Sequence, residues 1–317
     1  MKRLRHSTRA FSLAAAMKRG TDLRIRTIGH GRHPISDLFY ELMRMSWPAF
    51  AALFIGFFAS FNVLFGAIYA FDPGGLSIPP EHTTMPVFWR DFFFSVHTVA
   101  TIGYGNVYPL SVFANIVVVV EVTLGILFFA LTTGIVFARF SRPTARILFS
   151  EKAVVRDIDG VPTLMLRAAN QRHNLIYAAE VRVSLLEDED VGGTTMRRFR
   201  DLALIRESNP VFALTWTIMH RIEGDSPLVP WLAQRTMPNG REIVVLLSGF
   251  DQSSGQTIYD RTAYLPEDIA WGSRFIDIVG LDDSGTRTID YGRFHEVTAE
   301  RPADIAGATT SAAAGRP

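Results

Sequence analysis

Residues 91–105 have the sequence DFFFSVHTVATIGYG, and the interpretation of the whole chain starts from this stretch. Its first part, residues 91–100, is apolar but too short to cross a bilayer, and it is too hydrophobic for a solvated loop. A segment of this kind at membrane depth is tolerated only where it is buried in protein or lines a watery cavity. The stretch therefore predicts a re-entrant half-helix over residues 91–100, followed by the pentapeptide TIGYG.

Two long apolar runs flank this stretch. Residues 47–71 contain no charged side chain, and residues 110–138 contain a single one, Glu121. A helix of about 20 residues crosses the hydrocarbon core, so both runs predict membrane spans. Lys and Arg are concentrated before the first span, nine of them within residues 1–34, and again after the second span. The positive-inside rule then predicts that both termini are cytoplasmic.

The N-terminal part of the chain precedes the first span. Residues 35–46 carry apolar side chains mostly on one helical face, which predicts a helix lying in the membrane interface, although an ordinary surface helix has the same pattern. Residues 1–34 are interpreted as a basic cytoplasmic arm. A cleaved signal peptide is the alternative, but the short apolar island barely reaches the length of a signal-peptide core.

The hydrophobic pattern changes after the second span. Residues 141–298 contain short segments rich in β-branched and aromatic residues, separated by turns such as Asp159-Gly160 and Asn239-Gly240. Repeated short strands without interposed helices predict a β-sandwich or barrel. Residues 299–317 are small and polar with no aromatic residue, and we expect a disordered tail. The expected fold class is thus membrane α plus all-β.

Composition excludes several classes of function. The 317 residues carry a formal net charge of +1, which argues against a general nucleic-acid binder. The chain has no cysteine, so it has no disulfide, thiolate metal site or cysteine nucleophile. The sequence also lacks a P-loop, a dinucleotide fingerprint and an HExxH motif, and an enzyme is not expected. A two-span receptor that presents a β-sandwich is an alternative, but it leaves the half-helix and the pentapeptide unexplained.

The pentapeptide Thr101-Ile102-Gly103-Tyr104-Gly105 alternates glycine with larger residues. Glycine tolerates dihedrals that other residues resist, so the backbone can stay extended with its carbonyls turned to one side. The sequence nearly matches TVGYG, from which potassium-channel filters are built; there, four loops replace the hydration shell of the ion with carbonyl oxygens. A glycine-rich turn is the simpler interpretation of five residues. Their position after a half-helix and between two spans favours the filter.

At this point the chain resembles the inward-rectifier potassium channel family, and most closely its prokaryotic branch. The resemblance rests on FFFSVHTVATIGYG, on Gly125, on FARFSRP at residues 137–143 and on WTIMHRIEGDSPL at residues 216–228. It implies a homotetramer around one potassium-conducting pore and a cytoplasmic immunoglobulin-like sandwich that extends the pore. It also implies a location in the cell inner membrane, K⁺ as the transported ion and no organic cofactor or nucleic-acid partner.

The resemblance also implies roles for residues of the pore. The expected ion ligands are the carbonyls of Thr101 to Tyr104 and the Thr101 hydroxyl. Gly125 matches a hinge of the inner helix, and Phe137 matches the constriction at the helix-bundle crossing. Phe129 and Thr133 lie on the same helical stripe as Phe137, and phenyl rings on that stripe would close a pore by dewetting. Aromatic residues that face lipid or the protein core would have the same spacing.

Some positions depart from the family pattern or have two interpretations. His97 stands where Glu is common, and Val107 stands where its Arg partner is usual. We hypothesise that Glu121 supports the back of the filter with His97 as a possible partner; the alternative is an acid that snorkels to the outer headgroups. Around the cytoplasmic ends of the spans, the candidate contacts for anionic lipid headgroups are Trp47, Arg139, Arg142 and Arg146, although a topology signal accounts for the same arginines.

Overall fold

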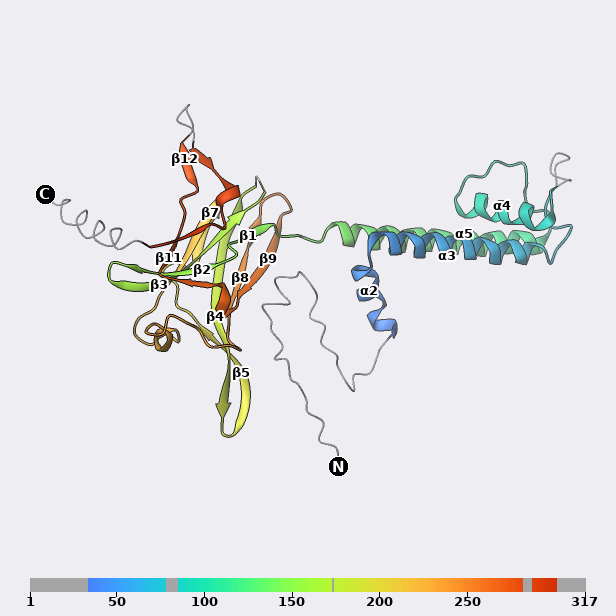
Figure 1. The fold of residues 1–317 in the computed structure, drawn as a ribbon. Helices are drawn as coiled ribbons and strands as arrows, with labels where there is room; N and C mark the ends of the chain where they lie inside the picture. The colour runs from blue at the N-terminus through green and yellow to red at the C-terminus, as the bar shows by residue number, and fades with distance from the viewer. Residues whose placement is uncertain (1–33, 78–84, 173, 282–286, 301–317) are drawn as a thin grey trace. The chain divides into compact units, whose positions relative to one another are not determined.

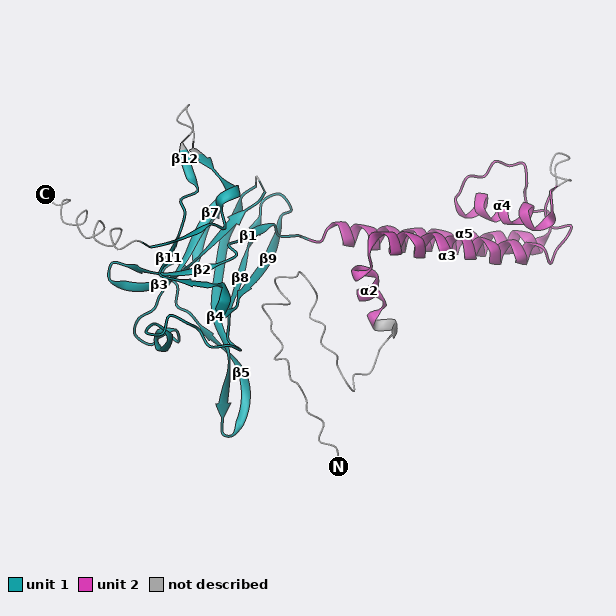
Figure 2. Ribbon diagram, in the orientation of Figure 1, with its two compact units in different colours: residues 1–26, 143–317 teal, residues 27–142 magenta. Residues whose placement is uncertain are grey.

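The structure is a computed structural model that describes residues 34–77, 85–172, 174–281 and 287–300. The described residues fall into two compact units, one ending at Arg142 and the other starting at Pro143 (Figure 2). Most of the predicted basic arm and of the predicted tail, residues 1–33 and 301–317, lies outside the described residues.

The first unit is helical. Its helices are α2 (Pro34–Arg44), α3 (Trp47–Tyr69), α4 (Val87–Val99) and α5 (Val112–Phe140). Helices α3 and α5 lie side by side, and α4 packs against both (Figure 1). Both α3 and α5 are long and apolar enough to cross a membrane. Each begins at a serine that caps it: Ser46 accepts from the Ala49 amide at 3.4 Å, and Ser111 accepts from the Ala114 amide at 3.0 Å.

The helix boundaries differ from the sequence-based ones by a few residues. Helix α2 ends at Arg44 because Ser46 already caps the next helix. Helix α4 starts at Val87 and not at Asp91, since Pro86 takes the N-cap position and its carbonyl accepts from the amides of Trp89 and Arg90. The charged pair Arg90 and Asp91 therefore lies inside the half-helix and does not mark its start.

The second unit is built from two five-stranded sheets. In the first sheet the order is β1-β3-β2-β10, and β7 also pairs with β3. Strands β2 and β10 are parallel. Its strands are β1 (Ile147–Phe149), β2 (Ala153–Ile158), β3 (Val161–Asn170), β7 (Thr215–Arg221) and β10 (Ile269–Trp271). In the second sheet the order is β5-β4-β8-β9, with β6 also paired to β4. Its strands are β4 (Ile176–Val191), β5 (Thr194–Asp201), β6 (Ser208–Phe212), β8 (Glu242–Asp251) and β9 (Gln256–Tyr264).

Side chains from both sheets form one core, which makes the unit a β-sandwich. Strand β4 alternates buried Val181, Val183 and Leu185 with exposed residues, as expected for a strand with one solvated face. These residues belong to the same apolar cluster as Leu164 and Ile218 of the first sheet. Two small antiparallel ribbons complete the described part of the unit: β11 (Ser273–Phe275) pairs with β14 (Val297–Ala299), and β12 (Val279–Leu281) pairs with β13 (Arg287–Ile289). Short 3₁₀ turns are found among the described residues at Val229–Trp231, Pro266–Asp268 and Tyr291–Arg293.

The candidate selectivity filter and its surroundings

The backbone of the pentapeptide alternates in the sign of φ. Thr101, Gly103 and Gly105 have φ of 56°, 59° and 77°, whereas the intervening Ile102 and Tyr104 are not in the positive region. This alternation lets successive peptide planes turn their carbonyl oxygens to one side. Thr101 is a non-glycine residue in the left-handed region, which is unfavourable by about 1–2 kcal/mol and is maintained only when the surroundings hold it.

The amides of this segment fold back onto the end of α4. The Thr101 amide donates to the Thr98 carbonyl at 3.0 Å, and the Ile102 and Gly103 amides donate to the His97 carbonyl at 2.8 and 3.4 Å. These bonds satisfy carbonyls that a helix leaves unpaired at its C-terminus. Within the described part of the chain, no backbone amide donates to the carbonyls of residues 101–104. The arrangement holds the amides and leaves the carbonyl oxygens available to a cation.

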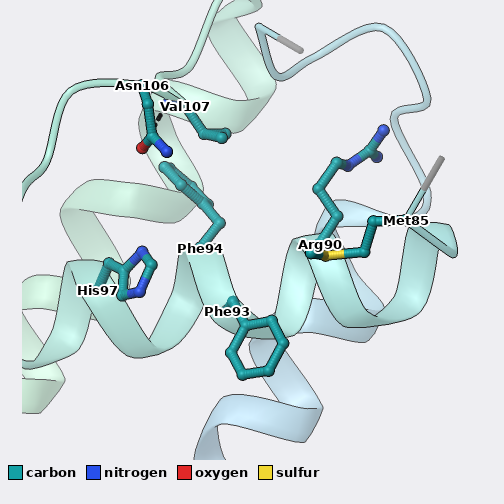
Figure 3. A pocket seen from close by; sticks show the side chains of 7 residues that line it. All are labelled: Met85, Arg90, Phe93, Phe94, His97, Asn106 and Val107. Carbon is teal, nitrogen blue, oxygen red and sulfur yellow. Dashed lines mark hydrogen bonds between the residues drawn. The ribbon is translucent and has the colours of Figure 1, made fainter. Parts of the chain in front are cut away.

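His97 lies beside the tyrosine of the pentapeptide. Its ring meets the Tyr104 ring edge to face, with centroids 5.0 Å apart. It also faces a small cavity of about 120 Å³ (Figure 3), which is lined by Met85, Arg90, Phe93, Phe94, His97, Asn106 and Val107. The guanidinium of Arg90 extends away from His97 in this view and bonds Asp91 through Nε at 2.7 Å. His97 thus contacts the filter through its ring and not through an ion pair.

Glu121 is fully buried, which contradicts the interpretation as a snorkelling acid. Its carboxylate accepts from the Tyr69 hydroxyl at 2.6 Å and from the Ser95 hydroxyl, so its observed partners are these two residues and not His97. The sequence reasoning missed Tyr69 and Ser95. The available signal was their polarity, because hydroxyl groups inside apolar membrane segments need a partner.

Comparison with known proteins agrees with this geometry. The family model for the inward rectifier potassium channel C-terminal domain matches residues 147–312, and an ion channel model matches residues 57–142. Inward rectifier potassium channel Kirbac3.1 of Paramagnetospirillum magnetotacticum is 37% identical over 264 residues, which cover 83% of this chain and 88% of that protein. The chain belongs to the inward rectifier potassium channel family.

Animal relatives match this channel over a similar span. Inward rectifier potassium channel irk-1 of Caenorhabditis elegans is 31% identical over 83% of the chain and 52% of its own length. Human ATP-sensitive inward rectifier potassium channel 10 is 30% identical over 83% of the chain and 74% of its own length. The expected fold class, a two-span pore unit followed by a β-sandwich, is confirmed, and the protein is a membrane channel that conducts K⁺ passively.

The inner helix of the channel, α5, runs unbroken through the predicted hinge. Gly125 is buried against the half-helix, and a Cβ at this position would lie 3.1 Å from Cγ1 of Val99. Phe129 lies near α3, with its ring centroid 6.2 Å from that of Phe58. Phe137, two turns further along, is 73% exposed in the single chain. Thr133 of the same stripe is exposed as well. Phe137 is therefore much more exposed than Phe129, whose ring lies against aromatic rings of α3.

The C-terminal end of α5 holds the end of α2. The guanidinium of Arg139 donates to the carbonyls of Leu42 and Met45, and it lies over the ring of Trp47 at 4.5 Å from the ring centroid. Arg142 donates to the Met43 carbonyl at 3.1 Å. These are carbonyls at or just beyond the C-terminal turn of α2, which lack helical partners and carry the negative end of the helix dipole.

Sequence reasoning assigned Trp47, Arg139, Arg142 and Arg146 together to lipid headgroups. The structure gives both Arg139 and Arg142 partners within the protein. The guanidinium of Arg146 has no hydrogen bond or ion pair to any residue that the structure describes. Arg139 and Arg142 thus donate hydrogen bonds to neutral carbonyls, whereas the donors of Arg146 are unused among the described residues.

Proposed function

We propose that four copies of this chain form one pore, in which the carbonyls of residues 101–104 and the Thr101 hydroxyl coordinate K⁺. The alternating φ of the pentapeptide supports this proposal, because it permits the oxygens to turn to one side while α4 holds the amides. One pentapeptide cannot surround an ion, and closed cyclic symmetry supplies the other three copies. The barrier to permeation falls because fixed carbonyl dipoles replace water around the ion.

The gate of this proposal lies at the cytoplasmic end of α5. Four Phe137 rings around the axis would close the pore to water and ions by dewetting, with Thr133 lining the cavity above them. Movement of the cytoplasmic sandwich would reach this point through α2, since Arg139 attaches α2 to α5. Gly125 would permit the bend of α5 that opens the pore. Anionic headgroups would bind at Arg146 and beside Trp47, in a bacterial inner membrane with both termini cytoplasmic.

Rubidium uptake into proteoliposomes of defined lipid tests the proposal. We compare the wild type with Gly103→Asp, which adds a charged side chain to the filter at a positive φ that is unfavourable for a non-glycine residue. Gly74→Asp is the matched control, because it puts the same charge where nothing lies within 4 Å of the added Cβ. The proposal expects barium-sensitive flux in the wild type and in the control and none in the filter variant, with all three tetrameric. Flux that survives in Gly103→Asp, or a wild type that never exceeds a dimer, would refute it.

A further inference from the structure

We infer that Asn62, Tyr69 and Ser95 form, with Glu121, a buried polar network that sets the position of the half-helix and thereby the geometry of the filter. The inference rests on the proposed function, because it assigns positioning residues to the same ion path. None of these side chains belongs to the proposed ion ligands. Each acts through α4, whose last carbonyls hold the filter amides.

The network joins helices α3, α4 and α5. The Ser95 hydroxyl on α4 faces two acceptors, Asn62 Oδ1 on α3 at 3.0 Å and a carboxylate oxygen of Glu121 on α5, and its one proton is donated to one of them at a time. The second oxygen of Glu121 accepts from the Tyr69 hydroxyl on α3 at 2.6 Å. The Asn62 amide nitrogen donates to the Phe58 carbonyl of its own helix at 2.7 Å. All four side chains are 0–2% exposed, so water does not substitute for a lost partner.

The spacing of the contacts along α4 and α5 fixes the register of these two helices against each other. Ser95 and Val99 are one turn apart on α4, and they contact Glu121 and Gly125, which are one turn apart on α5. These contacts prevent α4 from sliding or rotating against α5 without breaking a hydrogen bond or opening a close packing contact. The filter starts two residues after Val99, so a displacement of α4 is passed directly to the pentapeptide.

Helix α3 also approaches α4 closely beside the polar network. Asn62, Gly66 and Tyr69 follow the i, i+4, i+7 spacing of one helical face. A Cβ at Gly66 would lie 3.1 Å from the backbone of Phe92, so α4 rests directly on α3 between the two polar residues. A charged or polar side chain is costly at membrane depth unless it is partnered. The network supplies those partners to Glu121, and its hydrogen bonds attach α5 to α3 and α4.

Ion selectivity measured on the full-length channel tests the inference. Ser95→Ala removes the hydroxyl between α3 and α5, and Tyr69→Phe removes a single oxygen while the ring remains. Loss of a buried hydrogen bond shifts an equilibrium roughly tenfold, so we expect the rubidium-over-sodium flux ratio and the apparent barium affinity to fall about tenfold. Glu121→Gln keeps an acceptor and a donor in the same shape, and we expect it to retain most of the selectivity.

Thr123→Val is the matched control, since Thr123 is exposed on α5 and, among the described residues, its hydroxyl bonds only the Val119 carbonyl of its own helix, at 2.7 Å. Wild-type selectivity in Tyr69→Phe and Ser95→Ala tetramers would overturn the inference and leave the proposed function standing. Absence of flux in the wild type would instead refute the proposed function. If Ser95→Ala does not assemble, Tyr69→Phe decides, because it leaves the packing volume unchanged. An equal loss in Thr123→Val would also overturn the inference, since any lost hydroxyl would then have the same effect.

Discussion

Replacing Arg139 by Gln should release the end of α2 from α5. In the structure the guanidinium donates to the carbonyls of Leu42 and Met45, and it lies over Trp47 and Phe50 at 4.5 and 4.8 Å from their ring centroids. A glutamine reaches one carbonyl at most and carries no charge. Helix α2 would then lose the cap on its last turn, and its amides would open more often.

The size of the effect follows from these contacts. A hydrogen bond to a charged group contributes about 1.5–3 kcal/mol, and a partly exposed cation–π contact adds about 0.5–1 kcal/mol. Glutamine restores one neutral hydrogen bond, and Arg139 is only half-buried, so we expect a net loss of roughly 2–3 kcal/mol. Opening of α2 would become about 30- to 150-fold more frequent, because each 1.4 kcal/mol is a factor of ten.

Hydrogen–deuterium exchange of the α2 amides in the reconstituted channel measures this opening directly. Arg139→Lys should lie between the wild type and Arg139→Gln, since an ammonium keeps the charge but lacks the planar fork. Arg146→Gln is the control, and we expect no change in α2 because its guanidinium has no partner among the described residues. Exchange in Arg139→Gln within threefold of the wild type would show that α2 is not held by this contact.

Three further changes test other parts of the structure. Gly125→Ala should destabilise the folded channel by about 1–3 kcal/mol, because the added Cβ would lie 3.1 Å from Val99. Gly134→Ala, where nothing lies within 4 Å of the added Cβ, should not, and equal melting temperatures of the two variants would contradict this. Phe137→Ala should raise basal rubidium uptake several-fold if the rings close the pore, and unchanged uptake would remove Phe137 from the gate. Burial lowers the pKa of His220, so the unfolded chain binds the proton of this residue more readily than the folded chain does. The stability that neutral His220 contributes is therefore present above about pH 6.5 and is lost as the pH falls. Melting temperatures measured against pH should show this loss in the wild type and a weaker pH dependence in His220→Asn.

Patterns that depend on one segment were predictable from the sequence, whereas partners contributed by another segment were not. The length and apolarity of α3 and α5 follow from the bilayer alone, and the pentapeptide carries its own backbone requirement. Glu121 stood out as a lone charge in an apolar run. Its partners Tyr69 and Ser95 lie on two other helices, and the choice between them and His97 depends on how those helices are rotated.

The arginines at the end of α5 show the same limit. Their composition fits a lipid site or a topology signal, and only the position of α2 shows that Arg139 and Arg142 bond its carbonyls. In the sandwich, residues 212–222 look like one apolar strand, but a turn after Phe212 separates β6 in the second sheet from β7 in the first. The place of β2 between β3 and β10 likewise depends on a partner more than 100 residues further along the chain.

The parallel pairing of β2 with β10 has a consequence for biosynthesis. Both membrane helices and β2 leave the ribosome long before Ile269, the residue that pairs with Ala153, has been synthesised. During that interval one edge of β2 exposes unpaired amides and carbonyls, which are prone to pair with a neighbouring nascent chain. The first sheet is therefore complete only after translation has passed β10, and the open edge of β2 persists for the whole of that interval.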